Sequence, residues 1–259
     1  MKRRTLDIAF SFGGAVFAVL LLILGLVLKD QADFAKSYVH DQLAEQEISF
    51  KKADTLVSEA DFQATLLKSL GTKAAVDAFI ADKYVTSEAN SKCLNEFAGQ
   101  QMLTGKQAEC YANDFIRLHA LESSIVSGTG LKLPDGTPVD GVSYTYSSIS
   151  PAQTAAKAAV TAAKDAGKPA EEVAKLQAQA DKLQTLRIDT LLRAQTLRGL
   201  LLTTYGFSIF GEKADLAATV CYLAFALLLL LSILGLLHAF FSKHAKDQVL
   251  PPVQHAPEV

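Results

Sequence analysis

Residues 216–241 most constrain what this chain can fold into, because these 26 residues contain no Asp, Glu, Lys or Arg. A helix needs about 20 apolar residues to cross the hydrocarbon core of a bilayer, so this run is long enough. Residues 8–28 form a second uncharged run near the other end of the chain. Because backbone groups in lipid must bond to one another, both runs predict transmembrane helices.

Basic residues flank the two runs on their terminal sides, namely Lys2, Arg3, Arg4, Lys243 and Lys246. Short flanks that are rich in Lys and Arg stay in the cytoplasm. We therefore expect both tails, residues 1–7 and 242–259, to be cytoplasmic, and residues 29–215 to be extracytoplasmic. The tail 242–259 carries three prolines and is expected to be disordered.

The first run could instead belong to a cleaved signal peptide, since it follows a basic start. It is longer than a usual signal core, however, and residues 28–32 read Leu, Lys, Asp, Gln, Ala, without a small-x-small cleavage pattern. An uncleaved anchor is the preferred interpretation.

Small residues lie along one side of each run and predict close packing between membrane helices. They are Gly14, Ala18 and Gly25 in the first run, and Ala217, Cys221, Ala224, Ser232, Gly235 and Ala239 in the second. The contact could join the two spans or two protomers. Ordinary membrane composition would give the same pattern, since Gly and Ala are common in membrane helices.

The extracytoplasmic segment has mainly helical patterns, so the predicted fold class is mainly α, with two transmembrane helices flanking a helical domain. The first span is expected to continue as an amphipathic helix to about residue 43. Two short helices are predicted in residues 58–85, with a stop at Gly71. A further helical region is predicted in residues 91–121, with a break at Gly105.

Cys93 and Cys110 both fall in the extracytoplasmic segment, whereas Cys221 lies in the second span. The outer side of a membrane is usually oxidising, so a disulfide between the first two is favoured over two free buried thiols. A simple helical hairpin that turned at Gly105 would not bring the two cysteines level. Either the helices are shorter than this pattern suggests, or the bond is absent.

Residues 123–150 change character, because glycines and prolines punctuate them. They predict a long loop with a small hairpin about Pro134, Asp135 and Gly136. Long loops on a rigid scaffold often carry binding function, and a solvated connector is the equally weighted alternative.

A long helical hairpin is predicted for residues 151–205. Ser150 and Gln153 form a capping-box pattern around Pro151, which suits the first helical position. After a turn at Gly167, the second helix carries a heptad-like apolar seam and would be about 50 Å long at 1.5 Å per residue.

Residues 206–215 are predicted to form an interfacial elbow before the second span. Tyr205, Phe207 and Phe210 suit the membrane–water interface and are expected to anchor it. The alternative is one continuous, kinked helix.

The chain carries no recognisable catalytic motif, and neither a metal nor a cofactor is expected. His40 and His119 lack the spacing of metal ligands, and no Gly-x-Ser-x-Gly elbow is present. Thr104, Gly105 and Lys106 resemble the end of a phosphate loop. Because Gln107 replaces the required Ser or Thr, a polar turn is preferred.

The charge pattern excludes further classes of function. Residues 29–215 hold 20 Lys and Arg against 24 Asp and Glu, whereas nucleic-acid binding requires a basic face. The spans contain no Asp, Glu, Lys or Arg for an ion path, so a transporter or pump is not expected.

Three segments carry a family resemblance: residues 3–11, residues 196–211, and Cys93 with residues 105–113. They are similar to a group of bacterial two-pass membrane proteins of unknown function. The resemblance implies a bacterial plasma membrane (inner membrane) and names no reaction. The layout also resembles bacterial sensory receptors, although the short tail 242–259 holds no signalling part.

The expected function is therefore non-catalytic. The extracytoplasmic helical domain would mediate protein–protein interaction, as an accessory or scaffold subunit of an envelope complex. Its partners would be the lipid bilayer and another membrane or envelope protein, or a second copy of the chain. The alternatives are a sensor or ligand-binding subunit with a pocket near residues 123–150, and an enzyme of unrecognised chemistry that uses His40 or His119.

Overall fold

The computed structural model describes residues 3–51, 60–83 and 92–241. The structure is mainly helical (79%), and the described residues contain isolated β-bridges but no strands. The prediction of a mainly α fold is therefore confirmed. The predicted disorder of residues 242–259 lies outside the described residues. The chain divides into unit 1, made of Met1–Tyr38 and Ile209–Val259, and unit 2, made of Val39–Ser208.

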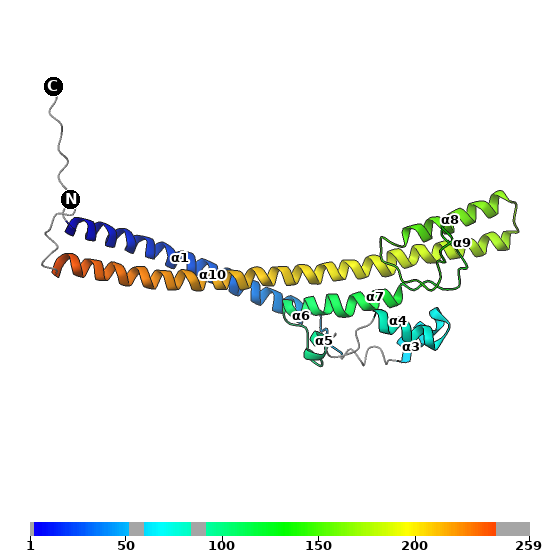
Figure 1. The fold of residues 1–259 in the computed structure, drawn as a ribbon, viewed down its shortest axis with the longest axis horizontal. Helices are drawn as coiled ribbons and strands as arrows, with labels where there is room; N and C mark the ends of the chain where they lie inside the picture. Colours follow the sequence, from blue (N-terminus) through cyan, green and yellow to red (C-terminus); the bar gives the residue numbers. More distant parts are fainter. Residues whose placement is uncertain (1–2, 52–59, 84–91, 242–259) are drawn as a thin grey trace, which may run out of the picture. The chain divides into compact units, whose positions relative to one another are not determined.

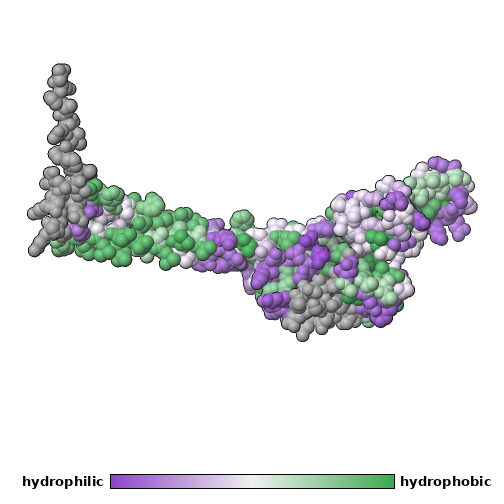
Figure 2. Space-filling view, viewed as in Figure 1, coloured by the Kyte–Doolittle hydropathy of each residue, from purple (hydrophilic) through white to green (hydrophobic). Residues whose placement is uncertain are grey.

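Unit 1 is a pair of antiparallel helices that lie side by side (Figure 1). It holds the larger part of α1 (Arg3–Ala44) and of α10 (Arg193–Phe241). Both helices are long and apolar enough to cross a membrane. Large apolar side chains stay exposed on their outer faces, for example Phe17 (55%) and Leu223 (68%), and Figure 2 shows a largely hydrophobic surface there.

Small side chains form the seam between the two helices. A Cβ added at Gly14 would lie 2.7 Å from Ser232 Oγ, and a Cβ at Gly25 would lie 2.8 Å from the Tyr222 ring. Gly235 faces Ser11 in the same way. The structure thus places these glycines between α1 and α10 of one chain.

The other small residues differ in how deeply they are buried. Ala18, Ser232, Ala239 and Cys221 are all buried, whereas Ala217 and Ala224 are half-buried. Ala218, which is 1% exposed, occupies the buried place beside Ala217. The helical spacing of small residues thus locates the face of each helix to within one position.

Charged side chains join the two helices near both ends of the uncharged runs. His238 Nδ1 lies 2.9 Å from Asp7 Oδ2, and the Arg4 guanidinium lies over the Phe240 ring. At the opposite ends, Lys29 Nζ lies 3.0 Å from Asp215 Oδ1, and Lys36 binds the same carboxylate. The apolar part of the pair is therefore bracketed by polar contacts.

The first part of unit 2 contains a short helical hairpin and, after it, a series of short helices. Helices α3 (Ala60–Leu70) and α4 (Lys73–Lys83) form a hairpin that packs on Ile125. Gly71 ends α3 with φ 82°, as predicted. Next come α5 (Lys92–Glu96), α6 (Gly105–Cys110), the π-helical turn η1 (Tyr111–Ile116) and α7 (Arg117–Ser123).

The second part of unit 2 is an antiparallel helical hairpin. It comprises α8 (Ser150–Asp165), α9 (Ala170–Thr185) and the π-helical segment η2 (Leu186–Leu192), which continues into α10. Ala156 and Val160 of α8 are buried with Ala180 and Leu183 of α9. The alanine face of α8 lets the two helices approach closely.

The loop between α7 and α8 is a packed element. The predicted hairpin is present, because Lys132 bridges Pro138 and Leu133 N donates to Thr137 O at 2.8 Å. Val126, Val139, Tyr144 and Ile149 are buried against the α8–α9 hairpin. The alternative of a solvated connector is therefore wrong, because this loop supplies part of the core.

The predicted capping box at Ser150 is wrong. Ser150 is the first helical residue, and the N-cap is Ile149, whose backbone is already helical and which makes no side-chain cap. Gln153 donates instead to Gln184 Oε1 and accepts from Arg187 Nη1, both at 2.9 Å. The Gln153 side chain therefore bonds to Gln184 and Arg187 instead of to the start of its own helix.

The predicted elbow at residues 206–215 is also wrong, because α10 runs through this segment without a break. The long second helix of the predicted hairpin is likewise continuous with the apolar run 216–241, as one helical stretch Ala170–Phe241. A glycine inside a helix costs only about 1 kcal/mol. Gly206 and Gly211 therefore do not interrupt α10.

Candidate functional site

A disulfide joins Cys93 of α5 to Cys110 of α6, with 6.0 Å between the two Cα atoms. The predicted bond is present because the helices are shorter than the sequence pattern suggested. Helix α5 ends at Glu96, and residues 99–102 pair with residues 48–50 through bonds such as Met102 N to Ile48 O at 2.8 Å. This pairing brings the two cysteines level.

A capping box fixes the start of α6. Gln107 N donates to Thr104 Oγ1 at 3.2 Å, and Thr104 N donates to Gln107 Oε1 at 3.0 Å. The segment is thus the polar turn that the sequence favours over a phosphate loop. Gly105 packs directly on Ser208, and a Cβ there would lie 3.3 Å from the Cα of Tyr205. Only glycine lets α6 approach α10 so closely.

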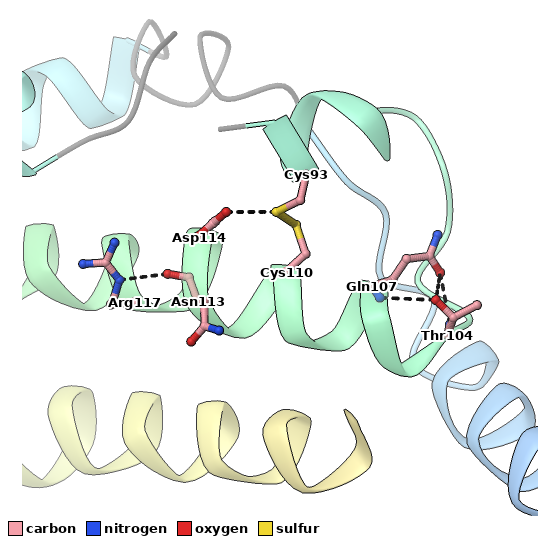
Figure 3. Close-up of a disulfide and its surroundings, with 7 residues drawn as sticks. All are labelled: Cys93, Thr104, Gln107, Cys110, Asn113, Asp114 and Arg117. Atoms are coloured by element: carbon pink, nitrogen blue, oxygen red, sulfur yellow. Dashed lines mark hydrogen bonds between the residues drawn. A yellow bond between two sulfur atoms is a disulfide. The ribbon is translucent and has the colours of Figure 1, made fainter. Parts of the chain in front are cut away.

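Asp114 points toward the disulfide from η1 (Figure 3). Its Oδ2 lies 2.9 Å from Cys93 Sγ. A disulfide sulfur carries no hydrogen, so a hydrogen bond here requires a protonated carboxyl that donates to sulfur. Burial raises the pKa of Asp114, against an opposing effect of the Arg117 charge. Both facts favour a neutral carboxyl beside the bond.

The disulfide lies in an open pocket of about 220 Å³, whose lining includes Lys106, Glu109 and Asp114. Among the described residues, one group of possible metal ligands has its sulfur and carboxylate oxygen atoms within 4.8 Å of one another. It consists of Cys93, Cys110 and Asp114. A metal would bind thiolates, so this group would hold one only after reduction of the disulfide. The bond between Cys93 and Cys110 instead makes this group a covalent link between α5 and α6.

Asn113 joins two arginines on the other side of η1. Arg117 Nε donates to Asn113 O at 2.9 Å, and Arg198 Nη2 of α10 donates to Asn113 Oδ1 at 2.9 Å. Figure 3 shows Asn113 directed away from the disulfide. Two consecutive side chains of η1 therefore contact different places: that of Asp114 contacts the disulfide, and that of Asn113 accepts a hydrogen bond from Arg198.

A cleft opens beside these arginines, with about 50 Å³ of internal space. Its lining comes from η1, α7, the loop, η2 and α10, and comprises Ile116, Arg117, Ala120, Leu121, Tyr144, Thr145, Leu191, Ala194, Gln195 and Arg198. Both π-helical segments contribute, Ile116 from η1 and Leu191 from η2. Such segments inside α-helices are frequent at functional sites.

Arg198 is only partly satisfied in this arrangement. Its Nε is buried and has no acceptor within the described part of the chain. A buried donor without a partner costs about 1–3 kcal/mol, so such a group requires an explanation. Arg198 is distinguishable in the sequence as the single charge in the apolar stretch 197–210.

The two histidines between the uncharged runs each contact one carboxylate. His119 Nδ1 lies 3.1 Å from Glu122 Oε2, and the pKa of His119 is raised by this hydrogen bond, against an opposing effect of burial. The His119 side chain is 65% exposed. His40 Nδ1 lies 3.1 Å from Asp41 on an exposed surface. Neither histidine lines the cleft or the disulfide pocket.

Asp140 organises the loop through backbone bonds. Gly130 N donates to its Oδ2 at 2.7 Å, Thr129 Oγ1 donates to its Oδ1 at 2.7 Å, and Thr129 N lies 3.0 Å from both oxygens. Burial would raise the pKa of Asp140, but these hydrogen bonds outweigh it and lower the pKa. The carboxylate therefore has a structural role in unit 2.

The predicted interfacial anchors lie on the unbroken helix α10. Phe210 is 76% exposed and Phe207 is 38% exposed, while Ser208 Oγ donates to Tyr205 O. Their place at a membrane interface stays a prediction.

Comparison with protein families, curated proteins and solved structures found no match for this chain. The resemblance to bacterial two-pass membrane proteins therefore stays a prediction.

Proposed function

We propose that this chain is a non-catalytic, membrane-anchored protein whose helical unit 2 binds another protein outside the cytoplasm. The anchor is unit 1. The contacts Asp7–His238 and Lys29–Asp215 bracket its uncharged segments. Residues 8–28 span about 31 Å at 1.5 Å per residue, which matches a hydrocarbon core of about 30 Å.

The proposed orientation rests on two independent features. Basic residues gather in the two tails, which favours the cytoplasm for both. The disulfide between Cys93 and Cys110 fits an oxidising compartment for unit 2.

One observation carries the interaction itself, an exposed face of α10 that we call the neutral stripe. It begins at the end of η2 and consists of Leu192, Thr196, Gly199, Leu200 and Thr203, all of them exposed. Leu200 is 62% exposed, and a Cβ added at Gly199 would meet nothing within 4 Å. Exposed apolar faces in water mark contact sites for other molecules.

The chemistry of the neutral stripe favours a second copy of the chain as the partner. The stripe carries no charge, so two copies related by a twofold axis would meet without repulsion. Thr203 Oγ1 already donates to Gly199 O at 2.9 Å, so burying this hydroxyl leaves no donor unpaired. Gly199 permits close approach of two helix backbones.

Crosslinking of the native protein in intact membranes, followed by mass spectrometry, tests this proposal. We expect reproducible crosslinks between copies that involve residues near the stripe, and we expect Leu200→Glu to abolish them. The matched control is Leu67→Glu, which places the same charge at another exposed leucine, on α3. Crosslinks to a different protein instead of a second copy would support the interaction function and identify that protein as the partner at the stripe. If the protein were monomeric and no crosslinked partner were found, the proposal would be wrong.

A sensor or ligand-binding subunit is the second candidate, and the cleft beside Arg198 is the observation that favours it. Tyr144 and Thr145 of the loop line this cleft, in the region where the sequence predicts a pocket.

A further inference from the structure

We propose that the cleft lined by Arg117 and Arg198 binds a small organic carboxylate. This inference goes beyond the interaction function, because it concerns a different surface of unit 2 and requires no partner protein.

The charge of the cleft favours an anion. Its ten lining residues include two arginines and no Asp or Glu. Asn113 binds one nitrogen of each guanidinium, through its backbone oxygen and its side-chain oxygen. It thereby holds both groups in place and leaves further N–H donors for a ligand. Guanidinium groups match the two oxygens of a carboxylate in geometry as well as charge.

The size and the walls of the cleft narrow the class of ligand. A buried site for one water needs about 10–15 Å³, so about 50 Å³ admits a ligand of several non-hydrogen atoms. Much of the wall is apolar, formed by Ile116, Leu121 and Leu191. An apolar wall beside two arginines suits a carboxylate with a short hydrocarbon body better than inorganic phosphate, which has no apolar part.

Two further observations distinguish this cleft from ordinary packing. Arg198 Nε is a buried donor without an acceptor in the described residues, on a side chain that lines the cleft. The π-helical segments η1 and η2 come from distant parts of the sequence, and both place a side chain on the wall. Packing alone does not require two such irregular segments to meet at one cleft.

The test uses the full-length protein in detergent micelles, with propionate and inorganic phosphate as probes and sodium chloride at equal ionic strength as the reference. Thermal unfolding is measured across a concentration series of each probe. We expect a saturable rise of the midpoint with propionate, because a ligand that binds only the folded state stabilises it. Arg198→Gln and Arg117→Gln should each weaken the apparent affinity about tenfold, the scale of one lost charge-assisted hydrogen bond.

The matched control is Arg193→Gln, which removes an exposed arginine of α10 that binds Asp189 and lies outside the cleft. This variant should respond as the wild type does. The proposal is overturned if wild type shows no saturable response, or if all three variants respond alike. A stronger response to phosphate than to propionate would overturn the carboxylate assignment. If Arg198→Gln does not fold, Arg117→Gln decides, since Arg117 is exposed. Crosslinking between copies is measured separately, so failure of either proposal leaves the other standing.

Discussion

The two units of this chain hold together by opposite means. In unit 1 the seam is built from residues with little or no side chain, such as Gly14, Ala18 and Ser232, while the large apolar side chains face outward. In unit 2 large side chains such as Leu94, Met102 and Leu201 point inward, and a disulfide supplements them. Large apolar side chains thus face outward in unit 1 and inward in unit 2.

The difference shows which contacts stabilise helices in water and which stabilise them in lipid. Water drives apolar side chains inward, at about 25 cal/mol per Å² of surface buried. Lipid is as apolar as leucine, so helices in it gain by close contact between backbones, which small residues allow. If the two units lie in these two environments, perturbations should act on them separately.

The largest expected effect comes from removing the disulfide. The bond closes a loop of 17 residues, and the double change Cys93→Ser with Cys110→Ser should destabilise unit 2 by about 3 kcal/mol on the chain-entropy model. Hydrogen exchange of the full-length protein in detergent, followed by peptide, should show faster exchange in unit 2 and unchanged exchange in unit 1.

Cys221→Ser is the control for the disulfide variant, because Cys221 lies free and buried in the seam of unit 1. It should leave exchange in unit 2 unaltered. Equal hydrogen exchange of unit 2 with and without the disulfide would contradict the statement that the disulfide stabilises unit 2.

The features that sequence alone predicts are those that depend on local composition. The uncharged runs 8–28 and 216–241 identify both long helices, and the Pro134–Gly136 turn identifies the small hairpin. The disulfide follows from a count of two cysteines in the segment assigned to the outside, although only the pairing of residues 48–50 with 99–102 explains how the cysteines meet.

The second effect in size tests the seam of unit 1. Gly25→Leu would force a side chain against Tyr222 and Cys221, since a single Cβ there already lies 2.8 Å from the Tyr222 ring. Overpacking of this kind costs about 1–3 kcal/mol. Disulfide crosslinking between cysteines introduced at the ends of α1 and α10 should slow markedly, while unit 2 keeps its exchange pattern.

Gly13→Leu is the matched control, twelve positions before Gly25 on the same helix. A Cβ at Gly13 meets nothing within 4 Å, so this leucine should be accommodated at the outer surface. Equal slowing by both variants would mean that the seam does not depend on small residues.

The features that sequence reasoning missed depend on residues far apart in the chain. Gln153 leaves the expected capping box for Gln184 and Arg187, whereas Thr104, whose extended backbone suits an N-cap, forms the box instead. The cleft needs Asn113 to meet Arg198, 85 positions away. Local patterns carry no information about such meetings.

The smallest effect concerns charge within unit 2. Asp140 accepts hydrogen bonds from Thr129 and Gly130, which lower its pKa. Asp140→Asn replaces one acceptor with a donor that faces the N–H groups, and should cost about 1 kcal/mol after allowance for solvent. Urea unfolding of the full-length protein, monitored on unit 2 by hydrogen exchange, measures this loss.

The pH dependence of that loss sharpens the comparison between the units. Because the folded pKa of Asp140 lies below the unfolded value of about 3.9, its stabilisation is fully present above pH 4 and is lost as pH falls through the folded pKa. The difference between wild type and Asp140→Asn should therefore shrink as the pH falls below about 4. Asp165→Asn, at an exposed acid of α8, is the matched control. A difference that stays constant with pH would mean that the carboxylate charge does not hold the loop. The packing of Val139 and Tyr144 against the α8–α9 hairpin would then be sufficient.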